Sequence, residues 1–384
     1  MKIGILTQPL HSNYGGVLQA WALQTILIRL GHDVVILNRD HNPEKRRKPL
    51  WHNILSQIKN ELYIALGIRK RFLPVTEALR TYSEQNILKF REGCFNEISP
   101  VLKSREQFLE YIDKYIFDAF IVGSDQVWRP KYSPDLMTYF LDFIEENNHV
   151  KRIAYAASFG TDEWEFTETQ TKEASRLLKK FNFISVRESS AVNIVKKYLN
   201  CDAIHVLDPT MLLTKDDYTK LIENTTNPFP KGNDDLFCYI LDKTKDSYKL
   251  INSCSKTLDY KAFYCESNNA LWHTEGKFKE RCIIPPIEQW LYAFKQAKMI
   301  ITDSFHGTVF SIIFNKPFWV IINKGRGSAR FKSILKCFDL EDRIIDSDTI
   351  DKDWNKPINW NQVNITLYQN RSSCIELLNQ TLNN

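Results

Sequence analysis

The sequence predicts an α/β fold made of two Rossmann-like domains that face each other across a cleft. The chain has 384 residues, of which 43% are hydrophobic and 25% charged, so it is globular and longer than one ordinary core requires. Short β-branched runs alternate with helical patterns along most of its length, which is typical of parallel sheets. Several runs end in small, polar or charged residues, as parallel strands do where their carboxyl ends line a ligand crevice.

The first domain is predicted over residues 1–207. Strands are expected at 2–6, 33–38, 117–122, 152–157, 183–186 and 203–207, with a helix at 17–30. Gly15 and Gly16 precede that helix, where glycines let backbone amides come close to a ligand. They do not form the G-x-G-x-x-G fingerprint and no acid follows at the ribose position, so nicotinamide and flavin sites are rejected.

Residues 41–110 differ from the rest of this domain, because they are charged, helical in pattern and basic at 45–48 and 69–71. We interpret them as a helical excursion on the acceptor side. Two interpretations of the basic clusters stay open. They form either a face for an anionic membrane surface or a diphosphate-bearing acceptor, or an ordinary solvated helix face.

The second domain is predicted over residues 208–348, on the donor side, after a crossing at Asp208-Pro209. Its strands are expected at 236–241, 260–265, 299–302 and 318–322, with a helix at 288–298. The tail, 349–384, ends in a predicted helix that could pack back on the first domain. Two such domains facing a cleft make the GT-B architecture, which many glycosyltransferases use.

The most informative segment runs from Thr302 to Thr308, between a buried strand and an apolar helix. Unpaired amides and the helix dipole favour anions at such a place. Ser304 and Gly307 would then hold a phosphate or carboxylate beside His306. The alternative is that Ser304 is only an N-cap and His306 an ordinary surface residue.

Other candidates also follow predicted strands. Arg187 suits a carboxylate or phosphate because its guanidinium is a planar fork, unless it simply pairs with Glu188. Arg330 is a second such arginine, reached from a glycine-rich loop. Asp125 is expected to orient a histidine or accept a sugar hydroxyl, and Trp128 to stack on a sugar ring.

Several classes of function are excluded by the sequence. A formal charge of +5 is too mild for a nucleic-acid partner, and no H-E-x-x-H motif or cysteine cluster predicts a metal. The eight cysteines form no C-x-x-C pair, which indicates free buried thiols in a reducing compartment. No apolar stretch is long enough to span a membrane. We therefore expect a cytoplasmic protein, placed at the inner face of the plasma membrane if the basic clusters bind there.

The chain resembles the polysaccharide pyruvyl transferase family over about residues 3–345. The segments that carry the resemblance are Asn-Tyr-Gly-Gly at 13–16, Val-Gly-Ser-Asp-Gln-Val-Trp at 122–128, Ala-Tyr-Ala-Ala-Ser-Phe-Gly at 154–160, Ser-Val-Arg-Glu at 185–188, Asp-Pro at 208–209 and Thr-Asp-Ser-Phe-His-Gly at 302–307. The resemblance implies a GT-B-like fold. It also implies transfer of a pyruvyl group from phosphoenolpyruvate, a co-substrate, to a sugar of a bacterial capsule or exopolysaccharide, giving a cyclic ketal without any cofactor.

His306 and Arg187 match positions that this family uses around the donor's phosphate and carboxylate. Our hypothesis makes His306 the general acid or phosphate stabiliser, Arg187 a clamp and Asp125 a base toward the sugar. The donor side adds Ser304, Gly307, Thr308, Arg330, Gly15 and Gly16, and the acceptor side adds Asn13, Tyr14 and Trp128.

Two other functions remain open. One is a GT-B glycosyltransferase with a nucleotide-sugar donor, although no base and ribose pocket can be identified in the sequence. The other is a non-catalytic partner in glycan assembly. The sequence does not determine the acceptor sugar, whether it is part of a lipid-linked oligosaccharide, or the oligomeric state.

Overall fold

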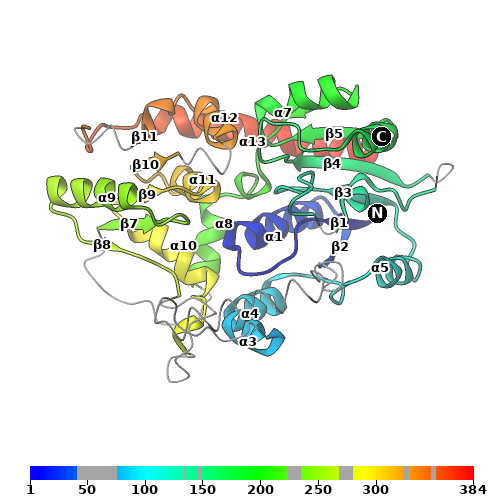
Figure 1. The fold of residues 1–384 in the computed structure, drawn as a ribbon, viewed down its shortest axis with the longest axis horizontal. Helices are drawn as coiled ribbons and strands as arrows, with labels where there is room; N and C mark the ends of the chain where they lie inside the picture. Colours follow the sequence, from blue (N-terminus) through cyan, green and yellow to red (C-terminus); the bar gives the residue numbers. More distant parts are fainter. Residues whose placement is uncertain are drawn as a thin grey trace, which may run out of the picture.

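The computed structural model describes residues 1–40, 76–133, 135–145, 149–223, 235–267, 280–322, 328–346 and 352–384. Two parallel β-sheets with flanking helices lie side by side (Figure 1). The blue-to-green part of the chain builds one unit, and the yellow-green-to-orange part builds the other. The predicted α/β class with two Rossmann-like units is therefore confirmed.

The N-terminal sheet has six parallel strands in the order β2-β1-β3-β4-β5-β6. Their bounds are β1 Lys2–Leu6, β2 Asp33–Leu37, β3 Ala119–Val122, β4 Lys151–Ala157, β5 Phe183–Val186 and β6 Ile204–His205. The order reverses between β1 and β3. Ligands of open α/β sheets bind beyond the carboxyl ends of strands at such a switch point, so a ligand site is expected at the loops after β1 and β3.

Helices alternate with the strands of this sheet along the chain. They are α1 Tyr14–Arg29, α3 Glu77–Ser83, α4 Gln85–Cys94, α5 Arg105–Ile112, α6 Glu168–Leu178 and α7 Ser189–Ile194, with short helical turns at η2 Leu136–Phe140 and η3 Val195–Leu199. Within the expected excursion, the part after residue 75 is helical as predicted. Residues 41–75, with both basic clusters, lie outside the described residues.

The C-terminal sheet has five parallel strands in the order β11-β10-β9-β7-β8, and it reverses between β7 and β9. The strands are β7 Leu236–Tyr239, β8 Ala262–Phe263, β9 Met299–Thr302, β10 Phe318–Ile321 and β11 Ile344–Ile345. The helices are α8 Lys215–Glu223, α9 Lys245–Leu258, α10 Ile287–Gln296, α11 Phe305–Ile313 and α12 Ala329–Cys337, with turns η4 Pro209–Met211 and η7 Glu341–Arg343. Strand β11 was not predicted, because Ile344 and Ile345 lie directly between the charged residues Arg343 and Asp346 and form no longer apolar run.

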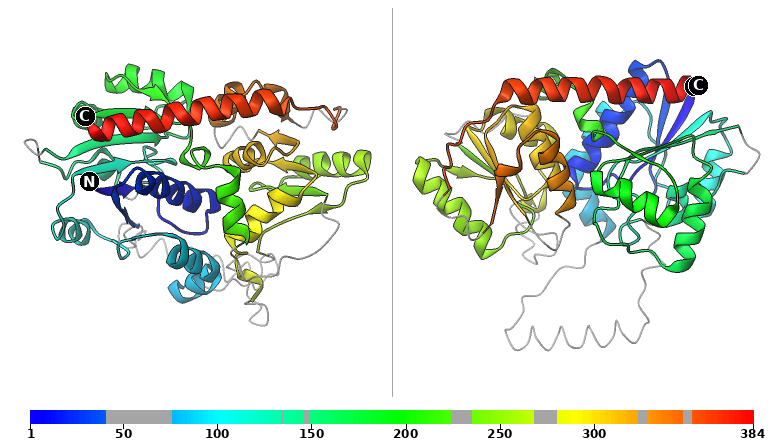
Figure 2. Two further views of the ribbon diagram at one scale, coloured as in Figure 1. Left: turned by 180° about the vertical axis from the view of Figure 1, so that it is seen from behind. Right: turned by 90° about the horizontal axis from the view of Figure 1, so that it is seen from above.

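The last helix, α13 (Trp360–Asn383), runs across both units, as the views from behind and above show (Figure 2). Arg371 Nε donates to the Met211 carbonyl at 2.8 Å, and Lys151 Nζ donates to the Leu382 carbonyl at 2.7 Å. Leu378 is fully buried on this helix. The tail therefore packs back on the first unit, as the sequence suggested.

The two units share one hydrophobic core rather than a thin polar contact. Tyr14 of α1 stacks on Trp290 of α10, with ring centroids 5.3 Å apart, and both rings belong to a core cluster that continues through both sheets. Asn86 of α4 also donates to the Ile284 carbonyl at 2.8 Å. All eight cysteines are free thiols, as predicted. Among the described residues, no helix is long and apolar enough to cross a membrane.

Candidate active site

The N-termini of α1 and α11 meet where the two sheets face each other. Helix α1 follows β1, and α11 follows β9, so both begin at the switch points of their sheets. Gly15 touches His306 so closely that a Cβ on residue 15 would lie 2.0 Å from His306 Nδ1. Only a glycine permits this approach. The sequence-predicted Gly15 and His306 are thus brought together from opposite units.

The start of α11 is built by local hydrogen bonds. Ser304 is the N-cap, and its Oγ accepts from the Gly307 N–H at 3.4 Å. Gly307 is also required, because a Cβ there would lie 2.2 Å from Thr302 Oγ1. The Thr308 hydroxyl donates to the Ser304 carbonyl at 3.2 Å. Ser304 is therefore an N-cap, as the alternative interpretation of this segment predicted. His306, at 7% exposure, is not the surface residue of that interpretation.

Asp208 lies at the centre of the site, although the sequence analysis used it only for a domain crossing and for the Asp-Pro segment of the family resemblance, and assigned it no role. Its Oδ2 accepts from Ser124 Oγ and from Arg187 Nη1, each at 3.0 Å, and lies 3.7 Å from His306 Nε2. Its Oδ1 accepts from the Thr210 N–H at 3.0 Å and hydroxyl at 2.7 Å. Burial acts to raise the pKa of Asp208, but His306, Arg187 and Thr210 together hold it well below its usual range.

Arg187 is buried among three carboxylates. Besides Asp208, its Nη2 lies 3.4 Å from Asp125 Oδ1 and its Nε lies 3.6 Å from Glu188 Oε1. The guanidinium carbon also sits 4.5 Å from the centre of the Phe305 ring. Burial acts to lower the pKa of Arg187, but the charges of Asp208, Asp125 and Glu188 raise it above its ordinary value. The pairing of Arg187 with Glu188 is confirmed, and its binding of a ligand's carboxylate or phosphate stays a prediction.

Two buried nitrogens of this cluster have no hydrogen-bond partner among the described residues. They are His306 Nε2 and Arg187 Nε. Their carboxylate neighbours lie at 3.7 Å and 3.6 Å, which is too far for hydrogen bonds. Buried polar groups are normally hydrogen-bonded, so this arrangement is suited to an acceptor-rich ligand.

Asp125 lies between Arg187 and the start of α1. Its backbone is left-handed, with φ of 67°, which is uncommon for a residue with a side chain. Its Oδ2 accepts from Asn13 Nδ2 at 3.4 Å, and Asn13 is exposed. Gly16 lies beside this contact, since a Cβ there would be 3.0 Å from Asn13 Nδ2. The carboxylate that faces His306 is that of Asp208, whereas Asp125 contacts Asn13 and Arg187.

A second arginine completes the cluster from α12. Burial and then the positive charge of Arg187 lower the pKa of Arg330 to about 10, against the opposing charges of Glu188 and Asp125. Burial raises the pKa of Glu188, whose carboxylate accepts a hydrogen bond from the Ser158 hydroxyl. Two guanidinium groups therefore share one environment with the carboxylates of Glu188 and Asp125.

Trp128 does not join the site. It is fully buried, its ring stacks on Phe140 with centroids 5.1 Å apart, and its Nε1 donates to the Tyr139 carbonyl at 2.9 Å. No ring face remains for a sugar. Trp128 is thus a core residue, and its expected stacking on an acceptor has to be corrected.

Tyr14 is likewise part of the packing between the two units. Its hydroxyl donates to the Pro285 carbonyl at 2.7 Å, while its ring lies on Trp290. Burial raises the pKa of Tyr14 well above its ordinary value. Because both the hydroxyl and the ring are already engaged, the structure gives Tyr14 no contact with an acceptor.

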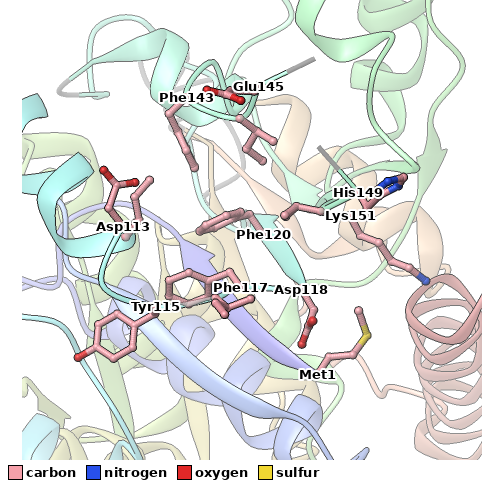
Figure 3. Close-up of a pocket in the computed structure, with 14 residues that line it drawn as sticks. Met1, Asp113, Tyr115, Phe117, Asp118, Phe120, Phe143, Glu145, His149 and Lys151 are labelled. Carbon is pink, nitrogen blue, oxygen red and sulfur yellow. The ribbon is translucent and has the colours of Figure 1, made fainter. Parts of the chain in front are cut away.

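A pocket of about 610 Å³ lies elsewhere, at the amino ends of the N-terminal strands (Figure 3). Its lining includes Met1 before β1, Asp118 before β3 and Lys151 at the start of β4, with the rings of Phe117 and Phe120. The cluster around Asp208 is at the carboxyl ends, so this pocket is not part of it. In the part of the chain that the structure describes, no group of histidine, cysteine or acidic side chains is arranged to hold a metal.

Comparison with known proteins agrees with this architecture. A UDP-GlcNAc 2-epimerase from Neisseria meningitidis, solved with bound UDP-GlcNAc, is 10% identical with a TM-score of 0.51, covering 100% of this chain and 99% of that chain. MurG from Acinetobacter baumannii is 11% identical with a TM-score of 0.42, covering 100% and 99%. At 10% identity the likeness to the epimerase concerns the fold alone, which is GT-B-like. Among curated proteins, none is matched by this sequence.

A family model gives the more specific result. The model described as polysaccharide pyruvyl transferase matches residues 13–325, which include the N-termini of both α1 and α11. This match spans most of the chain and includes His306, Arg187 and Asp208. The chain therefore belongs to the polysaccharide pyruvyl transferase family.

Proposed function

We propose that the protein transfers the pyruvyl group of phosphoenolpyruvate to two hydroxyls of one sugar in a bacterial surface glycan, forming a cyclic ketal. Membership of the family supports a pyruvyl transferase that acts on polysaccharide. The observation that carries the choice of donor is the pair of buried, unpartnered nitrogens on His306 and Arg187.

Phosphoenolpyruvate suits this cluster because it is small and carries a phosphate and a carboxylate. A guanidinium fork binds either group through two parallel hydrogen bonds, and Arg187 and Arg330 provide two forks. The first turn of α11 adds backbone amides and a favourable dipole beside Ser304 and Gly307. In the same way, Gly15 and Gly16 place the first amides of α1 on the donor side.

The reaction requires a proton donor, a base and stabilisation of the leaving phosphate. One sugar hydroxyl adds to C2 of the donor while the methylene carbon gains a proton and becomes a methyl group. The C2–O bond to phosphate breaks, and a second hydroxyl adds to C2 and closes the ketal ring. One of the two hydroxyl protons thus ends on the methyl group and the other on phosphate.

In this scheme His306 supplies the proton or stabilises phosphate, a role that contributes typically ~10²–10⁴-fold when it is general acid catalysis. Arg187 clamps the donor, and Asp125 removes a proton from the attacking hydroxyl. Asn13 is exposed beside Asp125, which supports an acceptor at that edge of the first unit. Residues 1–207 then form the acceptor side, residues 208–348 the donor side and residues 349–384 the helical tail.

The acceptor is proposed to be a sugar or a lipid-linked oligosaccharide at the cytoplasmic face of the plasma membrane. This depends on the basic clusters at residues 45–48 and 69–71. If they meet a diphosphate-bearing acceptor, charge reversal at Lys45 to Lys48 lowers activity on that acceptor and spares a soluble sugar analogue. Equal losses on both acceptors would count against the membrane contact.

The direct test is turnover. The purified protein is incubated with phosphoenolpyruvate and a panel of saccharides that offer vicinal or 1,3-placed hydroxyls, and both released phosphate and the new ketal methyl signal in ¹H NMR are followed. We expect both products to form together with wild type, and to form at least about 10²-fold more slowly with His306→Asn. Consumption of a UDP- or GDP-sugar instead would identify a glycosyltransferase, and inertness toward every donor would favour the non-catalytic partner.

A further inference from the structure

We propose that Asp208 is a positioning residue for this transfer, which holds the His306 imidazole and the Arg187 guanidinium in fixed places around the donor. This inference rests on the proposed function. The same carboxylate oxygen lies 3.0 Å from Arg187 Nη1 and 3.7 Å from His306 Nε2. It therefore connects the residue that clamps the donor with the residue that exchanges the proton.

The geometry leaves this carboxylate little freedom to move. Oδ1 is fixed by two hydrogen bonds from Thr210 within its own turn, and Oδ2 receives the Ser124 hydroxyl. The side chain of Asp208 has 0% exposure, so water does not compete for these contacts. A buried carboxylate fixed in this way can keep the side chains around it in one orientation. The aspartate of the Ser-His-Asp triad orients the catalytic histidine of hydrolases in the same manner.

The opposite edge of the imidazole is also fixed. His306 Nδ1 lies against Gly15, and the ring meets Phe305 edge-on at 5.2 Å. The ring is consequently held between the first turn of α1 and Asp208. At 3.7 Å, Asp208 faces Nε2 without forming a hydrogen bond, so this nitrogen stays available to a ligand.

The negative charge of Asp208 distinguishes a positioning role from a role in binding the donor. Asp208 is an anion inside a site for an anionic donor, and like charges repel. Its negative charge therefore weakens the binding of phosphoenolpyruvate even as it orders His306 and Arg187. Removing the charge should leave donor binding as tight as before, or tighter, while turnover falls. A residue that only supports the fold of the site would show weaker binding when it is changed.

The informative variant is Asp208→Asn. With its amide oxygen in the place of Oδ2, asparagine still accepts from Ser124 and Arg187. Its amide nitrogen can donate to the Thr210 hydroxyl oxygen, but it can no longer accept from the Thr210 N–H, so that one hydrogen bond is lost. The variant thus removes the charge that faces His306 and preserves most of the contacts. Thr210→Val is a second variant, which keeps the charge but frees Oδ1 from one of its two hydrogen bonds.

The matched control is Asp217→Asn. Asp217 is another ion-paired acid, with Oδ1 2.6 Å from Arg29 Nη2. It lies in the first turn of α8, away from the cluster around Asp208. Its neighbours lower the pKa of Asp217 to about 2 against the effect of its burial. Both substitutions remove one buried or half-buried carboxylate charge, but only Asp208 contacts the site.

Two quantities are measured, the dissociation constant of phosphoenolpyruvate by calorimetry and kcat with the saccharide that wild type turns over. We expect Asp208→Asn to bind phosphoenolpyruvate no more weakly than wild type and to turn over about 10²-fold more slowly, as loss of part of a general acid's contribution implies. Thr210→Val should show a smaller kcat loss in the same direction. Asp217→Asn should change neither quantity.

The inference is overturned if Asp208→Asn binds phosphoenolpyruvate more weakly than wild type, if it leaves kcat unchanged, or if Asp217→Asn has the same effect. A double variant adds an independent check, because residues that act as a unit are not additive. Asp208→Asn should have little further effect on kcat in a His306→Asn background, and an undiminished loss there would contradict the role. A wild type that neither binds phosphoenolpyruvate nor turns it over would instead refute the proposed function.

Discussion

At the scale of single residues, the site depends on an approach that only one side chain permits. Gly15 brings the first turn of α1 against the imidazole of His306, and no other residue type would fit between them. The sequence indicated Gly15 as a place where backbone comes near a ligand. The structure shows that the backbone comes near a catalytic candidate from the other unit.

Gly15→Ala is therefore expected to displace His306 and to lower turnover by about 10²-fold or more, which is in the range of a lost general acid. Gly93 in α4 is the matched control, because a Cβ there would have nothing within 4 Å. Gly93→Ala should stabilise the protein by up to about 1 kcal/mol and leave kcat unchanged. Unaltered turnover in Gly15→Ala would contradict the assigned contact.

Trp128 and Asn13 give opposite expectations. Trp128→Phe loses a buried hydrogen bond and packing volume, so it should lower the free energy of unfolding by about 1–3 kcal/mol and leave the KM for the saccharide unchanged.

Asn13→Ala removes an exposed amide beside Asp125 and should raise the KM for the saccharide with little loss of stability. Urea unfolding and initial rates test both, and a larger KM effect at Trp128 than at Asn13 would restore the sugar-stacking role.

Some of these residues could be predicted and others could not. His306, Arg187, Asp125 and Ser304 follow strands, and the position of polar residues after strands is readable from the chain. The central place of Asp208 depends on Ser124, Arg187 and His306, which come from three distant segments. Its only local signal was a carboxylate next to a proline at the end of a buried run. Likewise, Trp128 is buried by residues 136–140 and 159, which no local pattern assigns to it.

At the scale of elements, strand positions were predicted well and helix starts less so. The strand at Phe183–Val186 was predicted residue for residue, because a short β-branched run bounded by polar residues is a strong signal. Helix α1, by contrast, begins at Tyr14 rather than at residue 17. Two glycines argue against a helix locally, but Tyr14 packs on Trp290 and this tertiary contact decides.

The loop between β1 and α1 is anchored by a histidine whose charge depends on pH. His11 Nε2 lies 3.2 Å from Asp40 Oδ1, and Nδ1 lies 3.6 Å from Glu84 Oε2. The carboxylates of Asp40 and then Glu84 raise the pKa of His11 to about 9, against the effect of burial. Since the folded-state pKa is raised, the charged form stabilises the fold fully below pH 6.5 and ceases to do so as pH rises through about 9.

His11→Gln should therefore lower the free energy of unfolding at pH 6 and make little difference at pH 10. The side chain is 35% exposed, so solvent screening keeps the effect modest. Urea titrations of wild type and variant at a series of pH values measure the difference. A difference that grows with pH would show that the ion pairs do not stabilise this loop.

At the scale of the whole molecule, α13 and the shared core hold the two units together. Leu378 on α13 has 0% exposure, whereas Ile365 on the same helix has 51%. Leu378→Ala should lower the free energy of unfolding by about 2–5 kcal/mol, and Ile365→Ala should change it by no more than about 0.5 kcal/mol. Equal effects of the two variants in urea unfolding would mean that α13 does not pack on the units as described.

The presence of two Rossmann-like units could be predicted, because strands and helices alternate along the sequence. The way they meet was not, because Tyr14 with Trp290 and Gly15 with His306 are contacts between residues more than 270 positions apart. These contacts place the candidate donor site where the two sheets face each other. The central claim is thus that a cluster formed by both units binds phosphoenolpyruvate.

The measurement that tests this claim most directly is the thermal unfolding midpoint of the purified protein with phosphoenolpyruvate, with UDP- and GDP-sugars, and without ligand. A ligand at about 100 times its Kd that binds only the folded state stabilises it by about 2.7 kcal/mol, which raises the midpoint measurably. We expect phosphoenolpyruvate alone to raise it in wild type, and His306→Asn to reduce or abolish the rise. A rise with a nucleotide sugar and none with phosphoenolpyruvate would contradict the account.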